Sequence, residues 1–447
     1  MQKRAALIIV AFLLGTIFSA GVSFDTLEEE ARPQKSSFMN PSSWSTTEID
    51  NMTWGTMGGV TYDSAVVVDS SGGIHVAYVG QPGYDLKYAH FDGNNWDITI
   101  VDYANGSNSG VDEGLSIDLD SNGFVHIAYP VYGQGLKYAT NANNWSQTIN
   151  QSELNFQQRS GWISFQLYSG SIFHTSLKID SNDHANLMFS DSGTTNSGLK
   201  YYYDLDITTS FYSWEPYFVE EDVYRVSLEL DGNDNPHFAY VSDNDLNYAN
   251  NNNQTTSNSN WNNSLFTKNL DNLDLNLIST ALDRNLTMNV AVNDGTDERL
   301  SYYRGSGNNW SSFTVKEGVS HSKIALKSGD IPIIVYRNSG GLNLTMYDVA
   351  NNSWTEINLA SGMIKAPDIF IDEFDNTYIT FVQNGVLKIL THKSPGSPTT
   401  PALTELSNWT VSPSTGPSEG GTELTISGSG FSSLLDEEIS ELPEIIN

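Results

Sequence analysis

The chain has no cysteine and few cations, and both absences restrict what it can be. Without cysteine, neither a disulfide framework nor a cysteine-linked lipid anchor can form. Only 21 Lys and Arg residues stand against 53 Asp and Glu residues, so the net charge is -32. This balance argues against nucleic acid and anionic membrane surfaces as partners. Solubility in a salty medium accounts for the acidic excess without a specific role.

Long apolar runs are also scarce. Residues 1–4 are basic and are followed by a short apolar run at 5–20, which predicts a secretory signal over residues 1–23. An uncleaved N-terminal anchor is the alternative, although the run is short for a membrane span. No other stretch could span a bilayer, so we expect a secreted or cell-surface protein and not a multi-span membrane protein. Residues 24–43 are expected to be a disordered leader.

What the chain does contain is a repeat, of which residues 115–145 form one copy. We aligned the copies on the residue that ends their first apolar run, which is Asp69, Asp120, Asp180, Asp231, Asp283, Lys327 and Asp372. Nine residues further on, every copy has a large apolar or aromatic residue: Tyr78, Tyr129, Phe189, Tyr240, Val292, Tyr336 and Phe381. A Trp opens the last apolar run of six copies: Trp96, Trp145, Trp214, Trp261, Trp310 and Trp354. The residues at the ninth position should form the core between copies.

The spacing of the copies predicts the fold. A period of about fifty residues, with four short alternating strands separated by Gly, Asn and Asp turns, is typical of a propeller blade. The seventh copy lacks its last strand, and residues 44–50 resemble that missing strand. The sequence therefore predicts an all-β fold, a seven-bladed β-propeller of four-stranded blades over residues 44–393. We expect its ring to be closed by the N-terminal strand pairing with residues 387–391, which leaves no open sheet edge.

Some polar residues repeat with the blades, which favours a structural role. His75, His126 and His237 occupy the same position in three copies, so packing and hydrogen bonding are predicted for them rather than catalysis. Asp118, Asp120 and Asn122 resemble a D-x-D-x-N-G calcium loop. The sister turns keep only the Asp, which favours a turn that bonds its own backbone. No cofactor is predicted, and calcium at this loop is the open alternative.

The loops that do not repeat are expected to carry the function. The connections from one blade's outer strand to the next inner strand share a face with the loops between second and third strands, and this face should be strongly acidic with a few Arg. Its candidate catalytic residues are Glu220, Glu221, Glu317 and His321, and Arg225 is a candidate ligand-binding residue. Two carboxylates could serve as glycosidase acid and base, but no pair stands out.

An insertion at about residues 151–175, assigned to the third blade, adds Arg159, Trp162, Phe165 and Tyr168 to the candidate binding residues. Its aromatic side chains could stack on sugar rings. An extra strand or hairpin that buries them against the blade is an equal alternative. Asn-x-Ser/Thr sequons that could be glycosylated in an exported protein include Asn51, Asn105, Asn144, Asn285 and Asn309.

The C-terminal part differs from the repeats. Residues 394–407 form a linker rich in Pro, Ser and Thr. Residues 409–431 follow the pattern P-x-x-G-x-x-x-G-G-T-x-x-T-I-x-G-x-G-F and resemble the opening of an IPT/TIG domain, an immunoglobulin-like sandwich. Because only its first strands are present, we expect a partial IPT/TIG-like segment over 408–433, followed by an acidic tail over 434–447.

The repeats themselves resemble the BNR/sialidase-like secreted propellers, through motifs such as DSNGFVHIAY at residues 120–129. The resemblance implies the architecture. Sialidases carry S-x-D-x-G-x-x-W boxes and an Arg triad, and neither is recognisable in this chain. We therefore predict a non-catalytic binding or adhesion module whose partner is an extracellular glycan or protein. The alternative is a carbohydrate-active enzyme, either a glycoside hydrolase or a polysaccharide lyase.

Overall fold

The computed structural model describes residues 38–52, 63–80, 84–103, 111, 114–142, 157–192, 197–205, 216–242, 245–251, 262–267, 277–294, 298–348, 351–394, 407–412 and 425–429. The predicted signal, the acidic tail, Asn105, Asn144, Trp145, Trp214 and Trp261 lie outside these residues. Within them, no helix is long and apolar enough to cross a membrane.

Seven antiparallel sheets form the blades, each ordered from an inner to an outer strand. Blades 1 to 3 consist of β2 (Ser64–Val68), β3 (Ile74–Gly80), β4 (Asp85–Phe91) and β5 (Trp96–Asp102); β6 (Ser116–Leu119), β7 (Val125–Val131), β8 (Gly135–Thr140), β10 (Trp162–Tyr168) and β9 (Gln157–Arg159); and β11 (Ser171–Ile179), β12 (Ala185–Ser192), β13 (Gly198–Leu205) and β14 (Tyr217–Glu221).

Blades 4 to 7 follow the same order. They consist of β15 (Val223–Leu230), β16 (Pro236–Ser242), β17 (Asp245–Asn250) and β18 (Asn262–Thr267); β19 (Leu277–Leu282), β20 (Met288–Asp294), β21 (Arg299–Ser306) and β22 (Asn309–Lys316); β23 (Val319–Lys327), β24 (Ile331–Asn338), β25 (Gly341–Asp348) and β26 (Ser353–Ser361); and β27 (Ile364–Ile371), β28 (Thr377–Gln383), β29 (Val386–His392) and β1 (Ser45–Asn51). Strands β30 (Ser407–Ser412) and β31 (Thr425–Ser429) pair with each other.

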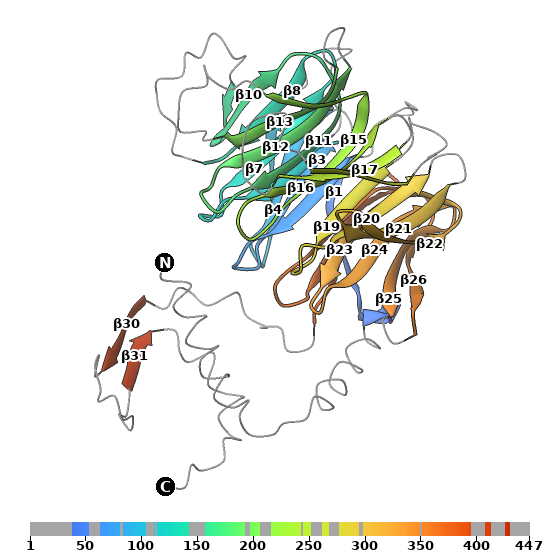
Figure 1. Cartoon of the computed structure of the whole chain (residues 1–447). Coiled ribbons are helices and arrows are strands. Elements are labelled where there is room, and N and C mark those ends of the chain that lie inside the picture. The colour runs from blue at the N-terminus through green and yellow to red at the C-terminus, as the bar shows by residue number, and fades with distance from the viewer. Residues whose placement is uncertain are drawn as a thin grey trace, which may run out of the picture.

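The ring closes as predicted. Strand β1 pairs with β29, so that Thr47 lies opposite Ile389 and Glu48 opposite Lys388. The inner strands β2, β6, β11, β15, β19, β23 and β27 each contact the next, and β27 contacts β2 (Figure 1). The predicted seven-bladed β-propeller closed by its N-terminal strand is therefore confirmed.

The expected disordered leader ends earlier than predicted. Asn40 caps a short 3-10 helix, η1 (Pro41–Ser43). Before it, the buried Phe38 packs against Trp44 and His392, with ring centroids 5.3 and 5.1 Å apart. The Trp44 indole also donates to the Phe38 carbonyl at 3.0 Å. Residues 38–43 thus belong to the fold, because their aromatic side chain has apolar partners on the closing blade.

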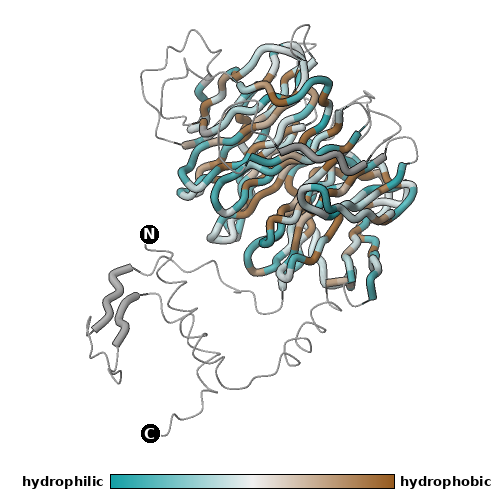
Figure 2. The backbone as a smooth tube through the Cα atoms, in the orientation of Figure 1, coloured by the Kyte–Doolittle hydropathy of each residue, from teal (hydrophilic) through white to brown (hydrophobic). Residues whose placement is uncertain are grey.

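The core lies between neighbouring blades, where Figure 2 shows apolar strands bounded by hydrophilic turns. All seven residues at the ninth position of the repeat are at most 2% exposed. This confirms the predicted interblade core. Both faces of each sheet pack on neighbours, so successive residues of strands such as β3 are buried.

The repeated histidines are structural, as predicted. The Nδ1 atoms of His75, His126 and His237 lie 2.6, 2.7 and 2.7 Å from a Tyr hydroxyl on the next strand. On the other side, each Nε2 faces the Asp of its own turn, at 3.0, 3.5 and 3.6 Å. In blade 3, Asn186 replaces the His, donating to Asp180 and accepting from Tyr201. The Asp, His and Tyr side chains thus link the turn to two strands of the blade.

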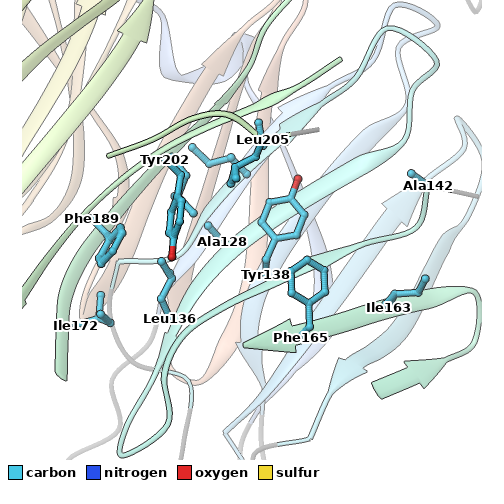
Figure 3. Close-up of a cluster of buried hydrophobic side chains, with 13 residues drawn as sticks. Ala128, Leu136, Tyr138, Ala142, Ile163, Phe165, Ile172, Phe189, Tyr202 and Leu205 are labelled. Atoms are coloured by element: carbon cyan, nitrogen blue, oxygen red, sulfur yellow. The ribbon is translucent and has the colours of Figure 1, made fainter. Parts of the chain in front are cut away.

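The outer strand of blade 2 differs from the prediction. Strand β10 pairs with β8 and opens at Trp162, so the sequence between 145 and 162 lies before the outer strand and not after it. Residues 157–168 of the insertion assigned to the third blade therefore belong to blade 2, with β9 as a fifth strand, whereas residues 171–175 lie in β11 of blade 3. Trp162 and Phe165 are only 4% and 1% exposed, and Phe165 faces Tyr138 (Figure 3). The alternative of a hairpin that buries its aromatic residues is the one observed.

Candidate functional site

The inner strands line a central channel in three rings. Because side chains alternate along a strand, the residues two, four and six places before the alignment residue face the channel. The residue six places before the alignment residue, called the sixth place, lies at the channel mouth in six blades: Asp63, Gly114, His174, Arg225, His321 and Ala366. The fourth place carries Ala65, Ser116, Ser176, Ser227, Ser279, Lys323 and Asp368. The second carries Val67, Asp118, Lys178, Glu229, Ala281, Ala325 and Phe370.

The middle ring ties the blades together. The hydroxyls of Ser116, Ser176 and Ser227 accept hydrogen bonds from the inner strand of the following blade, at 3.0, 3.0 and 3.1 Å. Ser279 repeats this contact at 3.2 Å, and the Asp368 carboxylate replaces it at 2.9 Å. Most of this ring is therefore structural.

In the deeper part of the channel, a lysine forms an ion pair with a glutamate. This part of the channel forms a cavity of 330 Å³. Lys178 Nζ lies 2.9 Å from the Glu229 carboxylate. Burial raises the pKa of Glu229 and of Asp118. Burial opposes the charge on Lys178, yet Glu229 and Asp118 keep the pKa of Lys178 above its usual value.

The channel mouth has an excess of cations instead. A cavity of 190 Å³ is lined there by Arg225, Arg337, Lys323 and Lys365, and among its described lining residues Asp63 is the one carboxylate. Asp63 accepts hydrogen bonds from the backbone N–H groups of Gly114 and Leu115, at 2.6 and 2.9 Å. The carboxylate thus fixes the entry to blade 2. Of the four cations that line the cavity, Lys323 lies 4.0 Å from the Asp368 carboxylate of the middle ring.

Backbone irregularities aim these side chains. A register shift directly precedes His174, Arg225 and His321 in their strands. Such β-bulges turn a side chain relative to the ladder and are common at the rims of closed sheets. In blade 7 the shift includes Ala366, whose φ of 46° is unusual for a residue with a side chain. Local strain of this kind is concentrated at functional sites.

Carbonyl groups hold the two guanidinium groups at the cavity wall. Arg225 donates from Nη1 to the carbonyls of Phe173 and Tyr224, at 3.1 and 3.3 Å. Arg337 donates to the carbonyl of Ile364 at 3.2 Å. These bonds position the two guanidinium groups at the wall of the cavity.

The two histidines of the mouth are neutral near pH 7. Burial, together with Lys323 and Arg337, lowers the pKa of His321 to about 3. Burial and then Arg225 hold the pKa of His174 well below its usual value. Among the described residues, the buried Nδ1 of His174 has no hydrogen-bond partner. Two neutral imidazoles therefore stand among fixed cations.

Only some of the predicted site residues line the mouth cavity. His321 and Arg225 line the cavity, whereas Glu220, Glu221 and Glu317 do not. Glu220 and Glu221 lie on the outer strand β14, and Glu317 is exposed between β22 and β23. Among the described residues that line the mouth cavity, Asp63 is the one carboxylate. The loops of the expected acidic face lie partly outside the described residues, so that expectation stays a prediction.

The aromatic insertion also lies away from the channel. Arg159 stacks on Tyr103 at 4.0 Å and donates to its hydroxyl at 2.7 Å. Tyr168 donates to Asp191 at 2.9 Å and packs on Phe189. With Trp162 and Phe165 in the core, none of these residues lines the mouth cavity.

The calcium candidates are held by three different sets of partners. Asp118 faces the channel and accepts from the Ile179 N–H at 2.8 Å. Asp120 accepts from the backbone of its own turn, and the Asn122 side chain donates to Asp183 of the neighbouring blade at 3.3 Å. Of the sequon residues, Asn51, Asn285 and Asn309 are exposed, and their glycosylation stays a prediction.

Sequence reasoning missed His174, Lys323 and Lys365 as members of one site. The signal for two of them was present, since His174 and Lys323 occupy the sixth and fourth places of the alignment. A comparison of the residues that differ between blades at these channel-facing positions would have placed His174 and Lys323 in one site. Lys365 lies off this pattern, and only the fold brings it to the mouth.

Comparisons with known proteins support the two parts of the fold separately. A model of the IPT/TIG domain matches residues 410–440, which confirms the predicted resemblance. A comparison with curated protein sequences finds no match.

Several solved structures are similar to the chain. Polysaccharide lyase Uly1 is 10% identical, with a TM-score of 0.50, and the alignment covers 77% of this chain and 92% of that chain. The Aleuria aurantia lectin AAL, in complex with Fucalpha1-6GlcNAc, is 13% identical, with a TM-score of 0.44 and coverage of 67% and 95%. The Hadza microbial sialidase Hz136 is 10% identical, with a TM-score of 0.38 and coverage of 74% and 66%. At these identities the similarity concerns the fold alone.

Proposed function

We propose that the protein is an exported binding module that takes an anionic glycan, one bearing carboxylate or sulfate groups, at the channel mouth. The observation that carries this proposal is the convergence of Arg225, Arg337, Lys323 and Lys365 on one cavity of a strongly acidic chain. Guanidinium groups match carboxylate and sulfate oxygens geometrically. A cleft lined by one sign of charge also concentrates counter-ions from solution.

The size of the cavity limits what enters it. Its 190 Å³ is below the roughly 300–1,000 Å³ typical of pockets that enclose a drug-sized ligand. We therefore expect one charged sugar unit, or its acid group, to enter the mouth while the rest of the polymer lies on the loop face. The neutral His174 and His321 can add hydrogen bonds there.

The test compares a uronic-acid polysaccharide, a sulfated polysaccharide and a neutral polysaccharide by calorimetry and retention. We expect binding of one or both anionic polymers, weakened by salt and by Arg225→Gln. Arg159→Gln is the matched control, because Arg159 is an exposed arginine outside the cavity. Equal binding of all three polymers, or equal loss in both variants, would contradict the proposal.

A polysaccharide lyase is the second candidate, favoured by the position of His174 and His321 among the cations that line the mouth cavity. A neutral imidazole could remove the proton next to the carboxylate of a uronic acid, whose negative charge the guanidinium groups would stabilise. The electron pair then forms a carbon–carbon double bond as the glycosidic bond breaks, and the leaving oxygen takes a proton from imidazolium or water.

The two candidates make different predictions for the same polymer. Elimination yields an unsaturated uronic acid with a new ultraviolet absorption, which His321→Asn or His174→Asn would abolish. Retention without this product supports the binding module. A glycosidase needs two carboxylates flanking the bond, and among the described residues of the mouth only Asp63 offers one.

A further inference from the structure

The first blade differs from its sisters at the Asp turn, far along β2 from the channel mouth. Asp69 and His75 form the pair that recurs in blades 2 and 4, but in blade 1 a second histidine, His90, lies opposite His75 on β4. In five other blades strand pairing places another residue at this position: Thr140, Asn250, Arg304, Met346 and Thr391.

The three side chains of blade 1 converge. One ligand atom from each of Asp69, His75 and His90 lies within 4.8 Å of the others. Among the described residues, this is the one group of three potential metal ligands that lie so close together. The His75 Nε2 atom is 3.0 Å from Asp69 Oδ2. The two imidazole rings stack with centroids 4.7 Å apart. Zinc bound tetrahedrally at about 2.0–2.2 Å holds neighbouring ligand atoms a little over 3 Å apart, so small rotations would complete such a set.

Gly73 leaves the space between these ligands open. A Cβ atom on Gly73 would lie 2.5 Å from Asp69 Oδ2 and 3.1 Å from His90 Nε2. Its φ is not in the left-handed region, so the backbone does not require glycine there. The other blades carry side chains at this place: Phe124, His184, Asn235, Thr287, Ile331 and Asn376. In blades 4 and 7 that side chain, Asn235 or Asn376, itself donates to the Asp.

The surroundings orient the ligands as metal sites require. The Tyr88 hydroxyl lies 2.6 Å from His75 Nδ1, so Nδ1–H can donate to it and leave the Nε2 lone pair for a metal. Asp69 Oδ1 accepts from the N–H groups of Ser71 and Gly73, at 2.7 and 2.9 Å, which leaves Oδ2 facing His75. Asp92 and Asp97 are near enough to act electrostatically on His90, and their charge favours a cation.

We propose that Asp69 Oδ2, His75 Nε2 and His90 Nε2 bind a zinc ion in blade 1. Two imidazole nitrogens and one carboxylate oxygen are ligands that zinc accepts, and the fourth position is left for water or an external group. The site stands apart from the channel mouth and is independent of the function proposed there. It uses the Asp–His pair that is structural in blades 2 and 4. To this pair blade 1 adds His90 as a third ligand, and it has Gly73 where the other blades carry a side chain.

The experiment titrates zinc into the full chain after treatment with a chelator, using calorimetry and competition with a chromogenic chelator. We expect one zinc per chain. His90→Thr introduces the residue of blade 2 and should weaken binding by about 100-fold or more, beyond the roughly 10–100-fold effect of losing an outer-shell partner. Gly73→Asn introduces the residue of blades 4 and 7 and should also abolish binding.

His126→Asn is the matched control, because it alters the equivalent pair of blade 2 and introduces the residue that blades 3 and 5 carry. Zinc binding should persist in it. Cobalt substitution should give visible bands of a tetrahedral ion in the unaltered chain and not in His90→Thr. Failure of the unaltered chain to bind zinc, or binding that survives His90→Thr in a folded variant, would overturn the proposal. Loss on His126→Asn equal to that on His90→Thr would overturn it too.

Discussion

The two ends of the inner strands follow opposite rules. At the turn end, one pattern recurs six times: the Asp carboxylate accepts from the backbone N–H groups two and four residues further on, at 2.7 to 3.1 Å. At the channel mouth, the sixth place of the same strands carries an acid, two histidines, an arginine and small residues. The repeated positions of the turns stabilise the blades. The positions at the channel mouth vary from blade to blade and provide the residues of the candidate site.

The largest expected effect breaks the framework at its closure. Trp44→Ala removes the indole that packs on Phe38 and His392 and donates to Phe38. A buried Trp truncated to Ala costs about 3–5 kcal/mol, so urea unfolding should show a loss of that order. Trp96→Ala, in a half-buried position on the outer strand of blade 1, should cost less. An equal loss of unfolding free energy in both variants would show that Trp44 at the ring closure contributes no more to stability than Trp96 on the outer strand of blade 1.

The turn comes next. Asp180→Ala removes an acceptor from the N–H groups of Asn182 and His184 and from the Asn186 side chain. Each buried donor left without a partner costs about 1–3 kcal/mol, so we expect a loss of about 3 kcal/mol in unfolding free energy. Glu317→Ala, on an exposed acid, should stay within about 0.5 kcal/mol of the parent. Similar values for the two would contradict the structural role of the repeated Asp.

The mouth should respond in the opposite way. Arg225→Gln removes charge-assisted hydrogen bonds worth about 1.5–3 kcal/mol each, so affinity for the anionic polymer should fall by about 10-fold or more. The melting temperature should change little, because the residue is not part of the repeated framework. If Arg225→Gln instead unfolds the chain without altering affinity, the mouth belongs to the framework and the contrast fails.

Near neutral pH the smallest effect is the pH dependence of stability that His321 contributes. The folded pKa of His321 is about 3, because of burial and the nearby Lys323 and Arg337, whereas an unfolded His has a pKa of about 6.5. Between these values the unfolded state binds more protons, so stability falls as the pH is lowered from about 6.5 toward about 3, by up to about 1.4 kcal/mol per pH unit. His321→Asn should flatten this slope when unfolding curves of the two proteins are compared. An unchanged slope would show that His321 is not held neutral.

A bound anion should reverse part of this effect. It favours the protonated imidazole, so binding should strengthen as the pH falls toward about 3, the folded pKa of His321. Elimination needs the neutral imidazole, so turnover should instead weaken over that range. The pH profile thus separates the binding module from the lyase.

The sequence predicted the framework well because the framework repeats. Seven aligned Asp or Lys positions, the large residues nine places later and the displaced strand at residues 44–50 define blades, core and closure. The failure in blade 2 has a physical reason. Trp145 and Trp162 both precede apolar runs, and only pairing with β8 selects Trp162 as the start of the outer strand. Periodicity within one strand does not reveal which of two similar segments finds a partner.

The sequence by itself determined the all-β class, the blade number and the structural role of the repeated histidines, because these depend on local alternation and on a pattern that recurs at fixed spacing. Only the tertiary structure decided which non-repeating residues share a site. Closing the ring places His174, Arg225, His321, Arg337 and Lys365 around one mouth, although they come from four different blades. In blade 1, strand pairing brings His90 beside His75. Contacts between residues distant in the chain follow from sheet pairing and ring closure, which no single segment encodes.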